Sequence, residues 1–456
     1  MAANSILGEI PADWEITTLG EVCARGGGSI QTGPFGSQLH ASDYVSDGVP
    51  VVMPTNIGEN QIKSEGIARI RPADVQKLRR HLLEDGDIIY SRRGDVERRA
   101  LVRNAEAGWL CGTGCLRVRL GKRVVVPAFA AYYLGHPSVR SWIVRHAVGA
   151  TMLNLNTGIL EALPFVVPPL RDQQHIAAFL SSLDDKIELN RRMNQTLEAM
   201  ARAIFKSWFV DFESRRQEHP RLANSFRESS LGLIPEGWGT GVLKDFVEEA
   251  VGGDWGEAAP SDTENEAVLC VRGTDIPYLQ DAEPGKMPVR FISARSLAKR
   301  ALRHGDLVIE ISGGSPGQST GRCVLIRQRM MDRFSCPLVC SNFCRTVRLQ
   351  SVHLSGFLYF WLDWLYSRGE FFQYENGTTG IKNLAFRAFS EIHQLVVPPK
   401  PALQAFYDLT SPLLDRQQSN GVESSILATL RDALLPKLLS GEIRVKQAEK
   451  IVGEVV

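Results

Sequence analysis

At 456 residues the chain is long enough for two or three domains, and 44% hydrophobic with 23% charged residues is the composition of an ordinary globular protein. Its 52 Lys and Arg balance 51 Asp and Glu, which excludes a uniformly basic protein, so any surface for nucleic acid must be local. The sequence shows no run of about 18 apolar residues and no basic segment followed by an apolar core. We therefore expect a cytoplasmic protein without membrane contacts.

Short strands and turns are predicted for the first 169 residues, which we expect to form one globular α/β (α+β) domain. A mixed helical stretch is expected at 127–146. Enrichment in β-branched and aromatic residues between turn signals marks the strands. The predicted strands cover residues 51–53, 87–90, 115–120 and 163–167.

A paired proline, Pro168-Pro169, precedes a run without Gly or Pro that predicts a long helix over 170–212. Its inward positions step alternately by four and three, the spacing of a coiled-coil seam, so the helix needs a partner. The predicted seam comprises Ile176, Leu180, Leu183, Ile187, Asn190, Asn194, Leu197, Ala201, Ile204 and Trp208. The aromatic residues near its end are expected either to pack on a globular domain or to contact a partner.

The same order of elements then returns. A polar, weakly patterned segment, 213–233, predicts a linker, and a second globular domain follows at 234–399. A second long helix is predicted over 400–445, and 446–456 are expected to be a frayed tail. The seam of this helix is predicted to contain Leu409, Leu413, Arg416, Asn420, Glu423, Leu427, Leu430 and Leu434.

Three signatures occur twice and indicate a tandem duplication. The Ile-Pro-x-x-Trp opening at Trp14 recurs at Trp238, and the Leu-x-x-Gly-Asp strand at Asp87 recurs at Asp306. The Val-Val-Pro-Pro boundary at 166–169 also returns before the second helix. Each repeat is therefore a globular domain followed by a long helix, and we expect the two helices to pair with each other as a coiled coil.

Polar residues occupy the middle of both predicted seams. These are Asn190 and Asn194 of the first helix and Arg416, Asn420 and Glu423 of the second. An unpaired buried polar group costs about 1 to 3 kcal/mol, so we expect these side chains to pair with one another. Such a layer can fix the register of the coil, and it can also contribute to a docking surface for partner subunits.

Motifs for catalysis and metal binding are missing from the sequence. It has no Walker loop, no HExxH pair and no Pro-Pro-aromatic methyltransferase loop, and the Gly-rich segment 313–321 lacks the Lys-Ser/Thr ending of a phosphate cradle. Cys111 and Cys115, and the group at 336, 340 and 344, have metal-like spacing but no second matching set. We predict a non-catalytic protein with reduced core cysteines and no bound metal or cofactor.

Arginines crowd one segment of each domain, next to the repeated Gly-Asp strand. The guanidinium fork matches phosphate oxygens and guanine edges, so we interpret both clusters as nucleic-acid contacts; the alternative is a solvated, salt-bridged surface. The candidate cations include Arg92, Arg93, Arg98, Arg99, Arg300, Arg303 and Arg322, with Arg79, Arg80, Arg103, Arg290, Arg295, Lys299, Arg327, Arg329 and Arg333 nearby. The candidate base readers are Thr55, Asn56, Thr274, Asp275, Ser315, Gln318 and Ser319.

These features together resemble the DNA-specificity subunit of type I restriction-modification systems. The resemblance rests on the three repeated signatures, on the Gly-Ala-Thr and Gly-Thr-Thr turns at 149–151 and 377–379, and on helix ends that read KSWFVDF and LLSGEI. It implies two target-recognition domains, each reading half of a split site in double-stranded DNA. It also implies that the two helices pair as an antiparallel coiled coil, which forms a spacer. It also implies docking of two modification subunits, which carry S-adenosylmethionine, and of restriction subunits that cleave unmethylated DNA.

Two other classes of function stay open at this point. The chain can be a non-catalytic protein-binding scaffold, which a DNA shift assay with the methyltransferase partner would distinguish. It can also be a self-sufficient DNA-modifying enzyme, which would bind S-adenosylmethionine or cut DNA without a partner. The bases read by each domain depend on loop geometry and do not follow from residue types alone.

Overall fold

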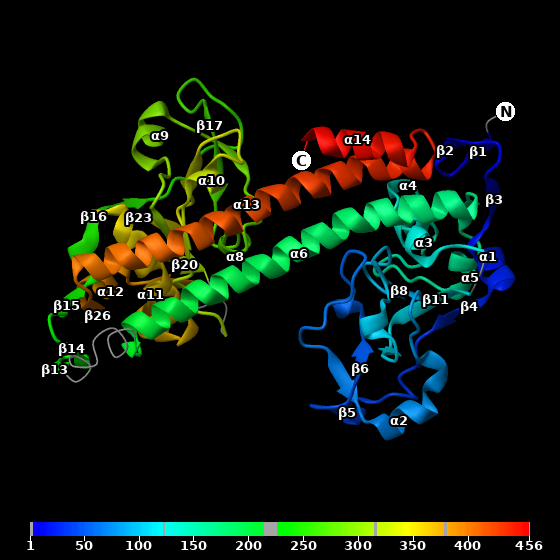
Figure 1. Ribbon diagram of the computed structural model, residues 1–456, viewed down its shortest axis with the longest axis horizontal. Coiled ribbons are helices and arrows are strands. Elements are labelled where there is room, and N and C mark those ends of the chain that lie inside the picture. Colours follow the sequence, from blue (N-terminus) through cyan, green and yellow to red (C-terminus); the bar gives the residue numbers. More distant parts are fainter. Residues whose placement is uncertain (1–2, 122–123, 214–225, 314–316, 378–380, 456) are drawn as a thin grey trace. The chain divides into compact units, whose positions relative to one another are not determined.

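A computed structural model describes residues 3–121, 124–213, 226–313, 317–377 and 381–455 (Figure 1). The chain divides into two compact units: unit 1 comprises Met1–Asp185 with Leu427–Val456, and unit 2 comprises Lys186–Ile426. Each unit contains part of two 40-residue helices, α6 (Leu170–Phe209) and α13 (Lys400–Leu439). Within the described ranges, no helix combines the length and the apolar character that crossing a membrane requires.

Unit 1 contains two four-stranded sheets. The first is antiparallel throughout, with β11 and β8 at its centre. In the second, β10 runs parallel to β6. In sheet order, the first consists of β4 (Gly27–Thr32), β11 (Cys115–Gly121), β8 (Ile88–Ser91) and β9 (Arg99–Leu101), and the second of β10 (Leu110–Cys111), β6 (Val49–Val52), β7 (Ala68–Ile70) and β5 (Tyr44–Val45).

Helices and one further strand pair complete unit 1. Strand β12 (Pro164–Val167) pairs with β3 (Glu15–Thr18), which ties the Pro-Pro exit to the start of the chain. The four strands expected from the sequence are confirmed as β6, β8, β11 and β12. The helices are α1 (Leu19–Gly26), α2 (Pro72–Lys77), α3 (Pro127–Tyr133), α4 (Pro137–His146) and α5 (Thr157–Glu161).

Unit 2 repeats this plan. Its main sheet has the same order of strands as the first sheet of unit 1, and its second sheet again places one parallel pair, β17 with β22, beside an antiparallel strand. In sheet order, the strands are β16 (Val247–Gly252), β23 (Cys344–Leu349), β19 (Leu307–Glu310) and β21 (Cys323–Leu325), then β18 (Val289–Ile292), β17 (Glu266–Val271) and β22 (Leu338–Cys340). The duplication inferred from the sequence is therefore confirmed at the level of sheet order.

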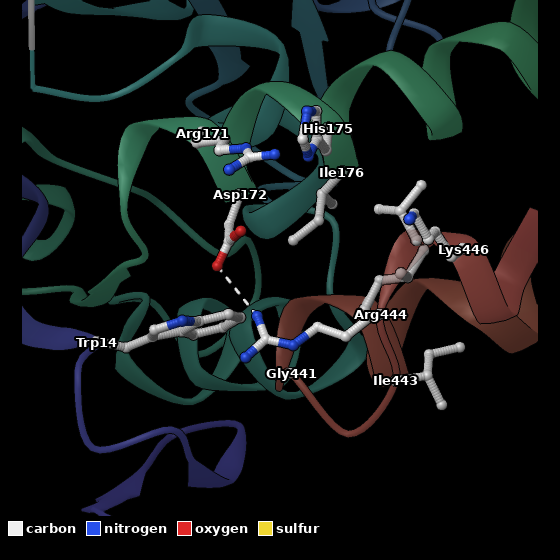
Figure 2. Close-up of a pocket in the computed structure, with 11 residues that line it drawn as sticks. Trp14, Arg171, Asp172, His175, Ile176, Gly441, Ile443, Arg444 and Lys446 are labelled. Atoms are coloured by element: carbon white, nitrogen blue, oxygen red, sulfur yellow. Dashed lines mark hydrogen bonds and ion pairs between the residues drawn. The ribbon is translucent and has the colours of Figure 1, made fainter.

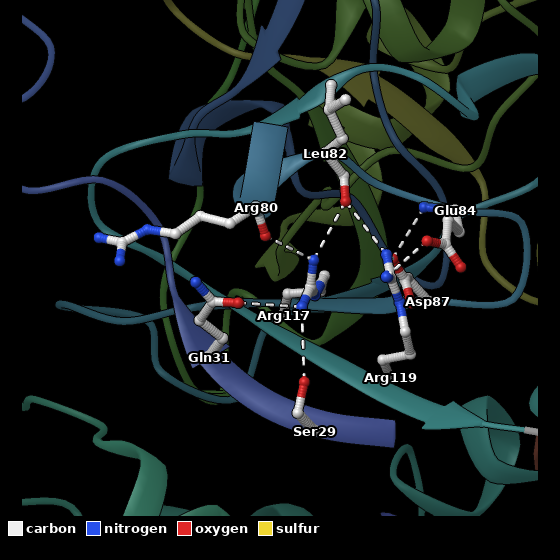
Figure 3. Close-up of polar contacts among 8 residues, drawn as sticks. All are labelled: Ser29, Gln31, Arg80, Leu82, Glu84, Asp87, Arg117 and Arg119. Atoms are coloured by element: carbon white, nitrogen blue, oxygen red, sulfur yellow. Dashed lines mark hydrogen bonds and ion pairs between the residues drawn. The ribbon is translucent and has the colours of Figure 1, made fainter. Parts of the chain in front are cut away.

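The repeated Gly-Asp signature is a structural device of this sheet. Gly86 adopts φ +87°, so the chain turns sharply before β8, and Asp87 accepts a hydrogen bond from the Glu84 backbone N–H at 2.8 Å. The same carboxylate pairs with the guanidinium of Arg119 on the neighbouring strand β11, whose Nη2 also donates to the Leu82 carbonyl (Figure 3). Arg117, two residues earlier, donates to the same carbonyl at 3.1 Å.

Unit 2 reproduces the device with its own residues. Gly305 adopts φ +91°, and Asp306 accepts a hydrogen bond from the Arg303 backbone N–H at 2.9 Å. Its ion-pair partner is Arg348 on β23, at 3.6 Å. The motif therefore recurs because both sheets need the same turn and the same buried charge pair.

The α6 and α13 helices pair antiparallel within each unit. In unit 1, Asp184 binds Arg431 at 2.6 Å and Asp172 binds Arg444 at 3.0 Å, so partner numbers fall as residue numbers rise. In unit 2, Asn420 donates to Asn194 Oδ1 at 2.9 Å. Predicted seam residues that are buried are Ile176, Leu180, Leu183, Asn190, Asn194, Ala201, Asn420, Leu427 and Leu434, and those partly buried are Ile187, Leu197, Ile204, Trp208, Leu413, Glu423 and Leu430.

One part of the predicted seam is wrong. Leu409 is 46% exposed and Arg416 is also exposed, so neither lies on the inner face of α13. The buried positions there are instead Phe406, Thr410 and Gln417. Thr410 tolerates burial because its hydroxyl donates to the Phe406 carbonyl within the same helix, and Gln417 donates to the Gln280 carbonyl.

Two further boundaries differ from expectation. The segment expected to be a frayed tail forms α14 (Val445–Val455), because Val445, Ala448 and Val452 share one helical face and Ala448 is fully buried. The expected linker 213–233 includes a hairpin of β13 (Phe226–Ser229) and β14 (Gly232–Pro235), while 214–225 lie outside the described residues.

The aromatic residues at the end of α6 belong to the core of unit 2. Phe205 and Phe209 are buried against Phe357, Phe406 and Trp238. Helix α11 (Ser355–Ser367), which carries Phe357, is apolar on nearly all sides and fills the same core. Of the two roles expected for these aromatics, packing on a globular domain is the one this core shows.

Candidate nucleic-acid interface

The loop after the Gly-Asp strand lies beside the turn that precedes the Pro-Pro exit. In unit 1 the Arg92 carbonyl accepts from the Leu155 N–H at 2.8 Å, and the Gly94 N–H donates to the Leu153 carbonyl at 3.0 Å. Two side chains of this turn, Val148 and Met152, are well exposed. The first arginine cluster and the Gly-Ala-Thr segment therefore form one continuous surface of unit 1.

The corresponding segments also meet in unit 2. Strand β20 (Ser312–Gly313) pairs with β25 (Lys382–Leu384), and the Leu384 N–H donates to the Ile311 carbonyl at 2.8 Å. Ser315, a candidate base reader, lies outside the described residues, as do 378–379 of the Gly-Thr-Thr turn. Two segments far apart in sequence thus meet in the same way in both units.

The four clustered arginines of unit 1 have different environments. Arg93 is exposed, and Arg98 is exposed but paired with Asp95 at 2.5 Å. Arg92 is half-buried. Arg99 is 5% exposed and its Nε donates to the Ala131 carbonyl at 2.8 Å, so the prediction that Arg99 contacts DNA is wrong: its side chain holds α3 on the sheet.

Several candidate base readers are also internal. Asn56 is buried, accepts from the Met53 N–H at 3.0 Å and donates to the Lys63 carbonyl at 3.2 Å. Asp275 is buried and holds Arg272 through two hydrogen bonds of 2.8 and 3.0 Å. These two residues shape their turns and are removed from the DNA-contact set, whereas their neighbours Thr55 and Thr274 are exposed.

The candidate residues around β19 and β21 divide in the same way. Arg322 pairs with the buried Glu310 carboxylate at 2.7 Å, and Ser319 is buried, so we leave both out of the DNA-contact set. Arg300 is half-buried and donates to the Gly252 carbonyl at 3.1 Å. Arg303 is exposed and remains open to a ligand, whereas the half-buried Gln318 places its side-chain amide against the Arg322 guanidinium.

Three further arginines of the second cluster bind the long helix. Arg327 pairs with Asp415 of α13 at 2.6 Å, Arg329 donates to the Ser419 hydroxyl at 2.8 Å, and Arg333 donates to the Ser425 hydroxyl at 3.0 Å. The backbones also approach closely, since a Cβ on Gly421 would lie 2.2 Å from the Ala282 carbonyl oxygen. These arginines therefore fasten the globular part of unit 2 to its helix.

A repeated loop was missed in the sequence. Gly33-Pro-Phe-Gly36 and Gly253-Asp-Trp-Gly256 occupy equivalent places, because a Cβ at Gly33 would meet the Gly112 carbonyl oxygen at 2.0 Å and one at Gly253 would meet that of Ser341 at the same distance. The ring of Phe35 lies 5.9 Å from Arg92 Cζ, and that of Trp255 lies 4.1 Å from Arg290 Cζ. The Gly-x-aromatic-Gly spacing occurs twice in the sequence, and this repetition could have identified the loop.

A pocket of about 310 Å³ in unit 1 lies where α6 begins and α13 gives way to α14 (Figure 2). Trp14 forms one wall, and the Asp172 carboxylate points at the Arg444 guanidinium across it. Arg171, His175 and Lys446 add further basic side chains. Among the residues that the structure describes, no group of three or more His, Cys, Asp or Glu side chains is placed to hold a metal ion. The eight cysteines are free thiols.

Comparisons with a family model and with known proteins point to the same kind of protein. A family model described as "Type I restriction modification DNA specificity domain" matches residues 11–199. The type I restriction enzyme MjaIX specificity subunit of Methanocaldococcus jannaschii is 24% identical over 97% of this chain and 96% of its own length. The HindI specificity subunit of Haemophilus influenzae is 24% identical over 81% and 89%.

A solved structure supports the fold. The crystal structure of a type I restriction-modification S subunit from M. genitalium superposes with a TM-score of 0.55 at 16% identity, covering 94% of this chain and 96% of that one. At this identity the similarity concerns the fold, namely two β-rich domains each followed by a long helix.

Proposed function

Because the chain belongs to the family of type I restriction-modification DNA specificity subunits, we propose that it selects a bipartite DNA target through two recognition domains, each reading one half. Specificity subunits are the non-catalytic component of such complexes. The observation that supports the bipartite reading is the duplication of contacts. Both units join the loop after the Gly-Asp strand to the turn before the Pro-Pro exit, so each presents its own version of one surface.

The domain limits follow from this proposal. We propose residues 1–169 as the first recognition domain and 170–212 as the first spacer segment, the limits that we predict from the sequence. The β13–β14 hairpin corresponds to β1 (Ala3–Ser5) with β2 (Gly8–Ile10), so the second recognition domain begins with the hairpin rather than at 234. It extends to 399, and the second spacer segment, predicted over 400–445, consists of α13, which ends at Leu439, and the turn before α14.

Exposed cations of both units are proposed to contact the phosphates of double-stranded DNA. In unit 1 these are Arg79, Arg80 and Arg93, and in unit 2 Arg295, Lys299 and Arg303. Each phosphate contact releases counterions, so binding should weaken as salt is raised. Thr55 and Thr274 remain candidate base readers near these surfaces.

Partner subunits are proposed to dock on the long helices. In unit 2, Leu189 and Met200 of α6 and Leu409 of α13 are exposed apolar side chains that a partner helix can cover. We assign this surface to two modification subunits, which bind S-adenosylmethionine and transfer the methyl group. Restriction subunits joining the same complex would cleave unmethylated DNA.

Domain exchange tests the proposal. Residues 14–163 are replaced by the matching part of the HindI subunit, the chimaera is assembled with the modification subunits, and the methylated bases are mapped by sequencing. One half of the recognised site should change while the other stays the same. A map that changes in both halves, or in neither, contradicts independent recognition.

The alternative of a self-sufficient enzyme is tested in parallel. The purified chain is incubated alone with S-adenosylmethionine and target DNA, and methyl transfer is measured. We expect none until the modification subunits are added. Transfer by the chain alone would instead assign the chemistry to it.

A further inference from the structure

We propose that in each unit the Gly-x-aromatic-Gly loop and the arginine over its ring form one DNA-contacting element: Phe35 with Arg92, and Trp255 with Arg290. The inference rests on the proposed function and names residues that carry it. Its chemistry is a guanidinium held by an aromatic face and offered to a pair of acceptor oxygens or to an oxygen and a ring nitrogen on DNA.

The backbone holds each loop in place. The Gly33 N–H donates to the Cys115 carbonyl at 2.9 Å, and the Asp254 N–H donates to the Cys340 carbonyl at 2.8 Å. No side chain fits at Gly33 or Gly253, as the close carbonyl oxygens of Gly112 and Ser341 show. Each aromatic residue is therefore presented by a rigid turn next to the sheets.

Among the residues that the structure describes, none accepts a hydrogen bond from the side chain of either arginine. Neither Arg92 nor Arg290 makes a side-chain hydrogen bond or ion pair with the described residues, and the Nε of each is buried without a partner. The terminal nitrogens of these half-buried side chains are not among the buried atoms, so they are the donors that a ligand with acceptor oxygens can meet. Their neighbours differ, since Arg98 is paired with Asp95 and Arg300 with the Gly252 carbonyl.

The aromatic ring gives the guanidinium its orientation. A guanidinium held over a ring by a cation–π contact keeps N–H groups at its edge directed outward. The planar fork then matches two phosphate oxygens, or O6 and N7 of guanine in the major groove. Phe35 is 54% exposed, so its ring can also contact the DNA that Arg92 holds.

The residues around Trp255 support the same role for the loop of unit 2. The Asp254 carboxylate accepts a hydrogen bond from the Ser296 hydroxyl, and Arg300 lies 3.9 Å from the same carboxylate. Helix α9 (Ala294–Arg300) therefore holds the loop in position. Arg295 and Lys299 of this helix are exposed. The element therefore lies next to the cations that we assign to phosphate contacts.

Substitution in the assembled complex tests the proposal. Arg92→Ala should weaken binding to the target duplex by about 5- to 100-fold, the range for loss of a bidentate contact. Arg92→Lys keeps the charge but loses the fork, so most of this loss should remain. Phe35→Leu should give a smaller loss, and Arg98→Ala, which removes an arginine already paired with Asp95, should change affinity less than about 2-fold. Arg290→Ala and Arg290→Lys test unit 2.

Two measurements distinguish the ligand atoms. A phosphate contact lowers the slope of log affinity against log salt by about 0.9 and leaves the methylation map unchanged. A guanine contact relaxes the map at one position, and only in the half read by the altered unit. Either result supports the element, because both need the same guanidinium.

The proposal is overturned if folded Arg92→Ala and Arg290→Ala complexes keep the wild-type affinity, salt slope and methylation map. Folding is checked by thermal melting, and if an alanine variant unfolds, the lysine variant decides by the same criteria. The domain exchange separates this failure from failure of the proposed function. A target that follows the exchanged domain while these variants bind normally would remove only the aromatic–arginine element.

Discussion

Arg119 binds Asp87 through two hydrogen bonds across neighbouring strands, with Nε 2.8 Å from Oδ1 and Nη2 2.7 Å from Oδ2. The Asp87 side chain is only 2% exposed, so its charge is compensated mainly by Arg119, which also pairs with the more exposed Glu84 at 2.6 Å. Asp87→Asn should lower the free energy of unfolding of unit 1 by about 2 to 4 kcal/mol, because it removes one partner of a buried pair. Urea denaturation followed by hydrogen exchange in each unit measures this. A loss below about 0.5 kcal/mol would show that the pair does not stabilise the sheet.

Asp306 should respond differently, although it holds the same place in unit 2. Its Arg348 partner is 3.6 Å away, and burial raises the pKa of Asp306 to about 6. Since the pKa is raised above that of the unfolded chain, the stabilising contribution is complete below about pH 4 and is lost as pH rises through about 6. Between pH 5 and 7.5, unit 2 should therefore lose about 1 to 2 kcal/mol, and Asp306→Asn should remove this dependence.

Melting temperature measured against pH, for the wild type and Asp306→Asn, checks this sign. Asp87→Asn is the matched control, because it alters the equivalent carboxylate in unit 1 and should leave the pH dependence of unit 2 in place. The prediction is contradicted if wild-type unit 2 becomes more stable from pH 5 to 7.5 and Asp306→Asn abolishes this increase in stability.

The polar layer of the helix pair should behave as a coupled unit. Asn420 Nδ2 donates to Asn194 Oδ1 at 2.9 Å, and Asn190 Nδ2 donates to Glu423 Oε2 at 2.8 Å. Asn420→Leu leaves the Asn194 oxygen buried without this donor, at a cost of about 1 to 3 kcal/mol. Adding Asn194→Leu should recover most of that loss. A double-mutant cycle in urea measures the coupling, and strictly additive losses would mean that the two amides do not stabilise each other.

The duplication was predictable because it depends on short local signatures, and the structure explains them. Gly86 and Asp87 were recognised as a repeated motif, but the Arg119 partner is set by strand register and is 32 residues away. The long helices were also predictable, since a run without Gly or Pro at seam spacing has few alternatives.

The errors came from contacts that a sequence does not display. Arg327 looked like part of a DNA-binding cluster because of its neighbours, yet it binds Asp415 of α13, 88 residues later. The alternating spacing of four and three predicts Leu409 in the seam, whereas Thr410 takes the buried position because its hydroxyl bonds within its own helix. Phe35 and Trp255 could have been predicted from the sequence, because the glycines on either side of them repeat.

The central claim is that the length of the two paired helices sets the distance between the two half-sites on DNA. One heptad is inserted in α6 after Asp185 and another in α13 after Ile426, where both helices pass from one unit to the other, so the contacts within each unit are kept. Seven residues at about 1.5 Å each lengthen both helices by about 10 Å and preserve the phase of the seam. An insertion in α6 alone, which has no matching change in α13, is the control and should abolish assembly.

The deciding measurement is the map of methylated bases produced by the complex with both insertions. We expect both half-sites to be unchanged and the non-specific spacer between them to grow by one to about three base pairs, at about 3.4 Å per pair. If the lengthened protein assembles with its modification subunits and still methylates sites of the original spacing, the helices are a docking platform and do not set the distance between the half-sites.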